Sequence, residues 1–84
     1  MKKCTEKSFE VLNYVRENGG KVSIPELAEA LGRTARSVGA NVTDLTKKEY
    51  AVREKVEVEG EDKPITYVVI TDAGKAYDPD LADE

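Results

Sequence analysis

The sequence predicts an α+β fold, in which three helices precede a β-hairpin and a short terminal helix. Three observations predict this order. Apolar residues recur at helical spacing up to about residue 48, they alternate with charged residues after Tyr50, and capping or glycine residues separate the segments. The 84 residues suffice for one domain with a single core. We expect this domain to span residues 1–77, followed by an acidic, mobile tail over residues 78–84.

The first helix is expected over residues 5–18. Thr5 can cap its start, and the Asn18-Gly19-Gly20 run can end it. The apolar stripe that would face the core consists of Phe9, Val11, Leu12 and Val15.

The second helix follows a very short strand that is expected over residues 21–23. Ser23 and Glu26 have the spacing of a capping box, and Pro25 fits the first turn of a helix because it needs no backbone bond there. The residues expected to face inward are Leu27, Ala28 and Leu31.

A tight turn is expected between the second and third helices. Gly32 can adopt the left-handed conformation that ends a helix, and the small Ala28 lets the next helix approach closely. Val38 would fill the angle between the two helices. This spacing is that of a helix-turn-helix motif, which indicates nucleic-acid binding.

The third helix is expected to begin after the cap Thr34 and to run to about Lys48. At roughly 100° per residue, its apolar and polar residues separate onto opposite faces. The core face would carry Ala35, Val38, Val42 and Leu45, and the solvent face Arg36, Ala40, Thr43 and Lys47, with Ser37, Asn41 and Asp44 on the flanks.

The β-hairpin is expected after Tyr50. Valines alternate with charged residues in the first strand, at positions 52, 56 and 58; a turn follows over residues 60–64, and the second strand over residues 65–71. Thr71 can cap a short terminal helix, which Gly74 would weaken. Tyr50 and Tyr67 are interpreted as packing residues rather than as stacking platforms for bases.

Composition limits the classes of function. The 13 basic and 17 acidic residues give a net charge of −4, so DNA binding would depend on local positive charge. No apolar run approaches 18 residues and no leader is evident, which predicts a cytoplasmic protein. Without histidine, and with Cys4 expected to be an exposed thiol, we expect no metal, no cofactor and no enzyme.

Residues 22–77 resemble the winged helix-turn-helix transcription regulators, broadly of the MarR-like kind. The resemblance rests on Glu26–Gly32, on the apolar positions of the third helix, and on the segments 47–53 and 69–75 that enter and leave the hairpin. It implies a winged helix fold, with a three-helix helix-turn-helix core, a C-terminal β-hairpin wing and a short terminal helix.

The chain departs from this family at four features. The family has an apolar residue at the position of Arg33 and glycine at that of Glu49, so both turns are expected to differ in detail. Its wing is commonly basic at the tip, whereas residues 53–63 hold three cationic and five acidic side chains, a balance of −2. The long terminal helices through which family members dimerise are also absent from this sequence.

Residues 33–48 are the candidate DNA-binding segment, because four cationic side chains against Asp44 alone give a local charge of +3. The expected base-reading residues are Arg36, Ala40, Asn41 and Thr43. The expected phosphate-binding residues are Arg33, Thr34, Ser37, Lys47 and Lys48. In the alternative interpretation, Arg36 belongs to an ordinary solvated face, and Lys47 and Lys48 pair with Asp44.

Two functions remain open from the sequence. The first is double-stranded DNA binding by a small transcriptional regulator. This regulator would act as a homodimer or with a protein partner, because a single domain binds DNA weakly. The second is a protein-protein interaction module that uses the acidic wing and tail.

Overall fold

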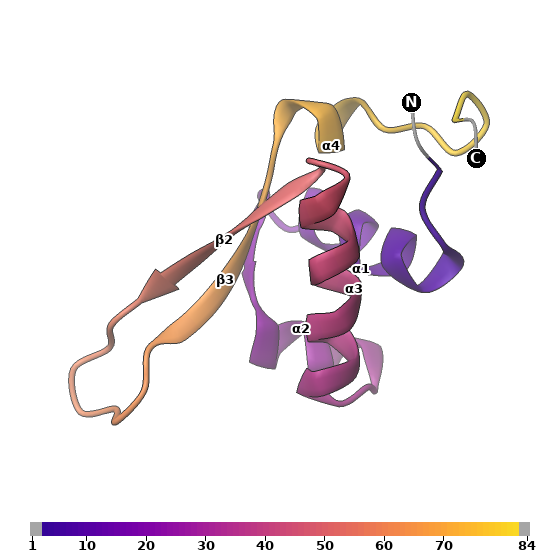
Figure 1. Ribbon diagram of the computed structural model, residues 1–84. Helices are drawn as coiled ribbons and strands as arrows, with labels where there is room; N and C mark the ends of the chain where they lie inside the picture. Colours follow the sequence, from indigo (N-terminus) through magenta and orange to yellow (C-terminus); the bar gives the residue numbers. More distant parts are fainter. Residues whose placement is uncertain (1–2, 83–84) are drawn as a thin grey trace.

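The computed structural model describes residues 3–82 and confirms the predicted α+β class. In this part of the chain, helices pack against one face of a three-stranded antiparallel sheet, and the hairpin extends beyond them as a wing (Figure 1). The elements in chain order are α1 (Glu6–Glu17), β1 (Lys21–Ser23), α2 (Ile24–Leu31), α3 (Ala35–Lys47), β2 (Ala51–Val56), β3 (Ile65–Ile70) and α4 (Asp72–Ala76).

Each helix begins after the capping residue that the sequence predicts. In every case a side-chain hydroxyl accepts a hydrogen bond from the backbone N–H three residues later, which satisfies one free donor of the first turn. The four caps are Thr5 at 3.2 Å, Ser23 at 3.3 Å, Thr34 at 3.1 Å and Thr71 at 3.1 Å.

The turn between α2 and α3 has the predicted helix-turn-helix form. Gly32 lies in the left-handed region with φ of 64°, and the N–H of Arg33 donates to the carbonyl of Ala28 at 2.9 Å. Val38 is fully buried between the helices, together with Leu27. The turn therefore keeps the form that the helix-turn-helix spacing predicts, although Arg33 stands where the family has an apolar residue.

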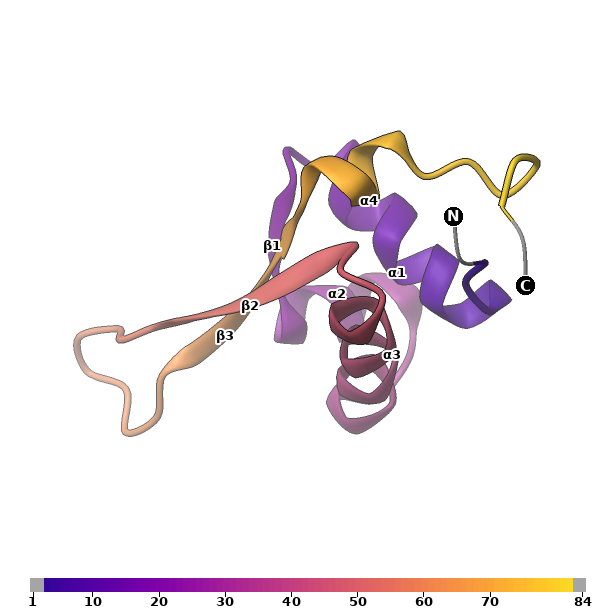
Figure 2. The ribbon, with the colours of Figure 1, turned by 45° about the horizontal axis from the view of Figure 1, so that its top comes forward.

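The sheet has the strand order β1-β3-β2, and all its pairs are antiparallel. The hairpin of β2 and β3 was predicted, and the pairing of β1 with β3 adds a third strand. The prediction that strand alternation reaches Val58 is wrong, because β2 ends at Val56. Beyond that residue the hairpin has left the helices (Figure 2), so Val58 has no core to pack on and is 37% exposed.

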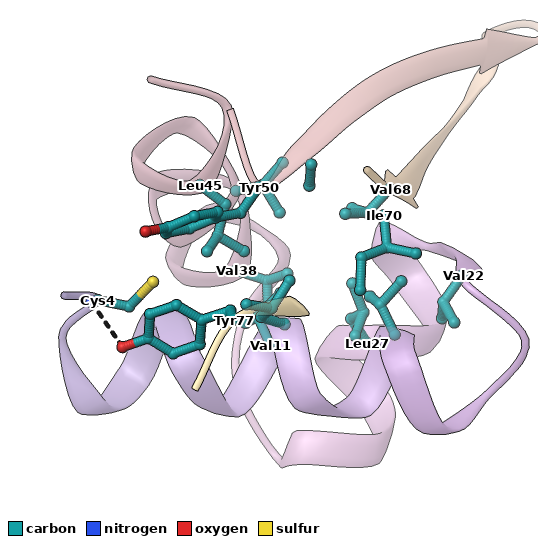
Figure 3. Close-up of a cluster of buried hydrophobic side chains, with 14 residues drawn as sticks. Cys4, Val11, Val22, Leu27, Val38, Leu45, Tyr50, Val68, Ile70 and Tyr77 are labelled. Carbon is teal, nitrogen blue, oxygen red and sulfur yellow. Dashed lines mark hydrogen bonds between the residues drawn. The ribbon is translucent and has the colours of Figure 1, made fainter. Parts of the chain in front are cut away.

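The core lies between the helices and the inner face of the sheet (Figure 3). The predicted stripe of α3 is buried except for Ala35, which is exposed because it stands in the first turn, ahead of the contact with α1 and α2. The residues of α1, α2, α3 and β3 that are completely inaccessible are Val11, Leu12, Val15, Leu27, Val38, Val42, Leu45 and Val68.

The two ends of the described chain are joined at Tyr77. Its hydroxyl accepts a hydrogen bond from the N–H of Cys4 at 3.0 Å, and its carbonyl accepts one from Arg16 Nη1 at 2.9 Å. The Tyr77 ring lies 5.6 Å from that of Phe9 and 5.0 Å from that of Tyr50, measured between ring centroids. We call this group the terminal clasp.

Cys4 is buried, so the expectation of an exposed thiol is wrong. The terminal clasp draws the residues before α1 onto the core, which the sequence pattern does not reveal. Burial raises the pKa of the Cys4 thiol, against the opposing effects of the Lys48 charge and of the hydrogen bond with Tyr77. The thiol is therefore held in its protonated, weakly reactive form.

Two turn positions differ from their sequence interpretation. Gly74 is required rather than a weakness, because a Cβ there would lie 2.1 Å from the carbonyl oxygen of Tyr50. Glu49 has φ of 65°, the conformation that glycine adopts most easily. The turn at Glu49 thus keeps a glycine-like backbone, although the residue is not glycine.

Residues 78–82 of the expected tail form a turn, in which the N–H of Leu81 donates to the carbonyl of Asp78 at 3.0 Å. Ala82 is partly buried against the core. The last two residues assigned to the tail, Asp83 and Glu84, lie outside the described residues.

Candidate nucleic-acid interface

The exposed face of α3 carries most of the predicted DNA-contacting residues. Arg36, Ala40 and Lys47 are exposed, and Thr43 is half-buried between them and the sheet. Within residues 3–82, neither Arg36 nor Lys47 makes a hydrogen bond or an ion pair. Both cations are therefore free to meet an external anion.

Arg53 of β2 joins this face, although the sequence interpretation counted it only in the charge of the wing. Its Nη2 donates to the carbonyl of Gly39 at 2.9 Å and to Thr43 Oγ1 at 2.6 Å. The strand register explains this placement, because Arg53 pairs with the buried Val68 and so points to the helix side of the sheet. Arg36, Lys47 and Arg53 together form what we call the cationic face.

Lys48 is directed toward α1 instead. Its Nζ lies 2.9 Å from Asp44 Oδ2, which also accepts a hydrogen bond from Ser8 Oγ at 3.0 Å. Burial opposes the charge of Asp44, but the hydrogen bonds of Lys48 and Ser8 outweigh it and lower the pKa of this carboxyl. Burial likewise disfavours the Lys48 charge, yet Asp44 raises the pKa of Lys48 above its ordinary value.

Asn41 and Arg33 form a second link on the same flank of α3. Arg33 Nη2 donates to Asn41 Oδ1 and, at 2.9 Å, to Ser37 Oγ. Asn41 Nδ2 in turn donates to Ser8 Oγ at 3.4 Å. These bonds would have to break before Asn41 could contact an adenine or Arg33 a phosphate.

Thr34 and Ser37 stand at the N-terminus of α3. Thr34 is exposed, and its hydroxyl accepts the hydrogen bond from the N–H of Ser37. The structure thus places five of the nine predicted residues on or beside the exposed side of α3, namely Thr34, Arg36, Ala40, Thr43 and Lys47. It directs the side chains of Arg33, Ser37, Asn41 and Lys48 toward polar contacts within the protein.

The wing tip has the opposite charge. Its loop forms a shallow hollow lined by Glu57, Val58, Glu59, Glu61, Asp62, Lys63 and Pro64. Four carboxylates against one ammonium group repel phosphate, so the wing tip is a poor contact for the DNA backbone.

Neither a metal site nor a membrane span is found in residues 3–82. No three side chains of histidine, cysteine, aspartate or glutamate are grouped so as to hold a metal ion. No helix of these residues combines the length and apolar character needed to cross a bilayer.

The sequence model of the MarR family matches residues 5–60. No curated protein matches the chain significantly. The matched segment covers α1, the helix-turn-helix motif and β2, and therefore contains all three residues of the cationic face.

Three solved structures share the fold. A transcriptional regulator homologue from Pyrococcus horikoshii OT3 superposes with a TM-score of 0.68 at 20% identity, over 81% of this chain and 64% of that chain. The structure of disulfide-formed AbfR superposes with a TM-score of 0.69 at 15% identity, over 84% of this chain and 46% of that chain. The structure of NadR in complex with 4-hydroxyphenylacetate superposes with a TM-score of 0.68 at 20% identity, over 84% of this chain and 48% of that chain. The chain spans less than two thirds of the length of each.

Proposed function

Because the chain belongs to the MarR family, we propose that it is the DNA-binding module of a transcriptional regulator and inserts α3 into the major groove of double-stranded DNA. The observation that carries the proposal is the cationic face. In a chain of net charge −4, three cations from two elements meet on the helix that the fold presents to DNA.

Base reading is assigned to the middle of α3. Arg36 is exposed and has the two parallel donors that match a guanine edge. The small Gly39 and Ala40 let the helix approach the bases, and the methyl groups of Ala40 and Thr43 can contact a thymine methyl. Arg53 donates a hydrogen bond to the Thr43 hydroxyl, so the Thr43 side chain is already oriented in the absence of DNA.

Phosphate binding is assigned to Lys47 and Arg53, with the hydroxyl of Thr34 and the first amides of α3 at the other end of the helix. Arg53 stands where the helix meets the wing, so it can contact the backbone between the two grooves. The acidic wing tip adds no attraction, which predicts weak binding with a small salt dependence.

Arg36→Ala is the first test. We expect it to reduce discrimination between duplex sequences by about 1 to 3 kcal/mol, the value of a bidentate base contact, while the melting temperature stays unchanged. Fluorescence anisotropy with a selected and a scrambled duplex measures both affinities. Wild-type discrimination by Arg36→Ala would contradict the assignment of the reading face.

Lys47→Ala and Arg53→Ala test the phosphate contacts. Each should weaken all duplexes alike and lower the slope of log affinity against log salt by about one. Lys21→Ala is the matched control, because it removes a cation of β1 whose ammonium group is paired with Glu54 at 3.2 Å. An equal loss in Lys21→Ala would mean that net charge alone, and not the cationic face, attracts DNA.

The protein-interaction alternative is not favoured by the family match. The same titrations distinguish it, because a module that uses only its acidic wing would not bind duplex DNA through the cationic face even at low salt.

A further inference from the structure

A buried serine joins α1 to α3. Of the serine, threonine, amide and charged side chains in residues 3–82, only that of Ser8 is buried, and Ser8 is 1% exposed. Its hydroxyl donates a hydrogen bond to Asp44 Oδ2 at 3.0 Å, and it accepts one from Asn41 Nδ2 at 3.4 Å and one from Thr5 Oγ1 at 3.0 Å. A hydroxyl has one donor and two acceptor positions, so the hydrogen-bonding capacity of Ser8 is fully used.

The two partners on α3, Asn41 and Asp44, are three residues apart and therefore lie on the same flank of the helix. Each also accepts a hydrogen bond from a cation, Asn41 from Arg33 and Asp44 from Lys48 at 2.9 Å. We call Ser8, Asn41 and Asp44 together the polar seam. Because the seam joins one point of α1 to two points of α3, it restricts both the rotation of α3 about its axis and its shift along that axis.

The apolar contacts between the same two helices do not impose this restriction. Burial of apolar surface is not directional, and aliphatic side chains of similar size can pack in more than one arrangement. A buried polar residue, in contrast, can fix one register of a helix pair. The apolar residues that α1 and α3 contribute to the core are Val11, Leu12, Val15, Val38, Val42 and Leu45.

We propose that Ser8 is a positioning residue for DNA reading, which sets the rotation of α3 on α1 and thereby orients Arg36 and Thr43 toward the bases. The inference rests on the proposed binding of DNA by α3. Ser8 itself is buried and does not contact DNA, so it acts only through Asn41 and Asp44.

The required precision gives the seam its effect. Helix side chains end about 5 to 6 Å from the helix axis, so a rotation of α3 by about 20° displaces them by about 2 Å. A binding constellation tolerates only about 0.5 Å and 10 to 20°. Charge attraction between Lys47 and a phosphate has no such directional requirement, so it survives the same rotation.

Ser8→Ala is therefore expected to reduce sequence discrimination and to leave general affinity unchanged. The ratio of affinities for a selected and a scrambled duplex should fall at least about fivefold, the lower limit for the loss of one bidentate base contact. Affinity for the scrambled duplex should match that of the wild type. Fluorescence anisotropy, at a temperature where circular dichroism shows each variant folded, measures both affinities.

Val15→Ala is the matched control. It opens a cavity at a second completely buried position of α1 and destabilises the protein, but it leaves the polar seam in place. Its discrimination ratio should equal that of the wild type. An equal loss in Val15→Ala would overturn the proposal, because lower stability alone would then explain the result.

A second variant tests the same link from α3. Asp44→Ala removes one end of the seam from a half-buried position, so it should also lower discrimination. Ser8→Ala already disconnects Asp44 from α1, so the double variant should discriminate no worse than Ser8→Ala. A further loss in the double variant would show that the two residues act separately and would overturn the proposal.

Residual dipolar couplings of the α1 and α3 amides, measured without DNA, report the orientation of the two helices directly. In Ser8→Ala the couplings of α3 should no longer fit the wild-type orientation relative to α1, whereas in Val15→Ala they should. Unchanged couplings in Ser8→Ala would refute the role of Ser8, whether or not DNA binds. A wild-type chain that binds no duplex at low salt would instead refute the proposed function.

Discussion

Glu49→Gly is expected to stabilise the protein. Glu49 has φ of 65°, which costs an L-residue about 1 to 2 kcal/mol and costs glycine almost nothing. The turn cannot relax, because the Glu49 carbonyl accepts a hydrogen bond from Thr71 Oγ1 at 2.6 Å and the next residue, Tyr50, donates its N–H to Leu45 at 2.9 Å. Substitution by glycine therefore removes strain without removing either contact.

The gain is partly offset by the larger entropy that glycine gives the unfolded chain, about 0.5 to 1 kcal/mol. At the midpoints of these two ranges, the net effect is a stabilisation of about 0.75 kcal/mol, equivalent to a rise in melting temperature of roughly 3 to 6 °C for a domain of this size. Urea denaturation followed by circular dichroism measures the free energy of unfolding.

Glu49→Ala is the control for this experiment. It removes the same carboxylate but retains the Cβ that makes the left-handed conformation costly, so its stability should stay near that of the wild type. If Glu49→Gly proves no more stable than Glu49→Ala, the strain assigned to this turn is not present.

Three further predictions concern stability and charge. Leu45→Ala should cost about 2 to 5 kcal/mol, because the side chain is completely buried between α1 and α3; urea denaturation will show it, and a cost near zero would contradict the packing. Asp44→Asn should lose about 1 kcal/mol at neutral pH, after allowance for its one-third exposure. Because folding lowers the pKa of Asp44, its contribution to the free energy of unfolding is present above the unfolded pKa near 4. This contribution disappears as pH falls through the folded pKa. A stability difference between the wild type and Asp44→Asn that persists in strong acid would contradict the pairing. Deleting residues 78–84 removes four acidic residues and takes the net charge from −4 to 0, so duplex affinity should rise at low salt and approach the wild-type value near physiological ionic strength; equal affinities at low salt would refute competition by the tail.

The helices and their caps could be predicted because local chemistry determines them. Thr5, Ser23, Thr34 and Thr71 act within three residues of their own position, and the α3 stripe follows from helical spacing alone. The errors came from distant contacts. The residues near Gly74 in the sequence do not indicate that the carbonyl oxygen of Tyr50 occupies the space a Cβ at position 74 would need.

In the candidate site, too, the positions set by local spacing could be predicted and those set by distant contacts could not. Arg36, Ala40 and Lys47 could be placed on the exposed side of α3 from spacing, and they lie there. Arg53 could not, because its position depends on the register of β2 against β3. A polar residue on the flank of a helix can equally face a neighbouring helix, and the bond of Asn41 to Ser8 of α1 is formed across such a contact.

The terminal clasp gives the single thiol of this chain a use as a reporter. Cys4 is covered as long as Tyr77 holds the segment before α1, so an alkylating reagent can reach its sulfur only when the clasp opens. In native buffer, the labelling rate then measures the opening equilibrium of the two chain ends, separately from unfolding of the α3 core. Tyr77→Phe, which removes the hydroxyl that hydrogen-bonds both the N–H and the thiol of Cys4, should accelerate labelling while the core remains folded.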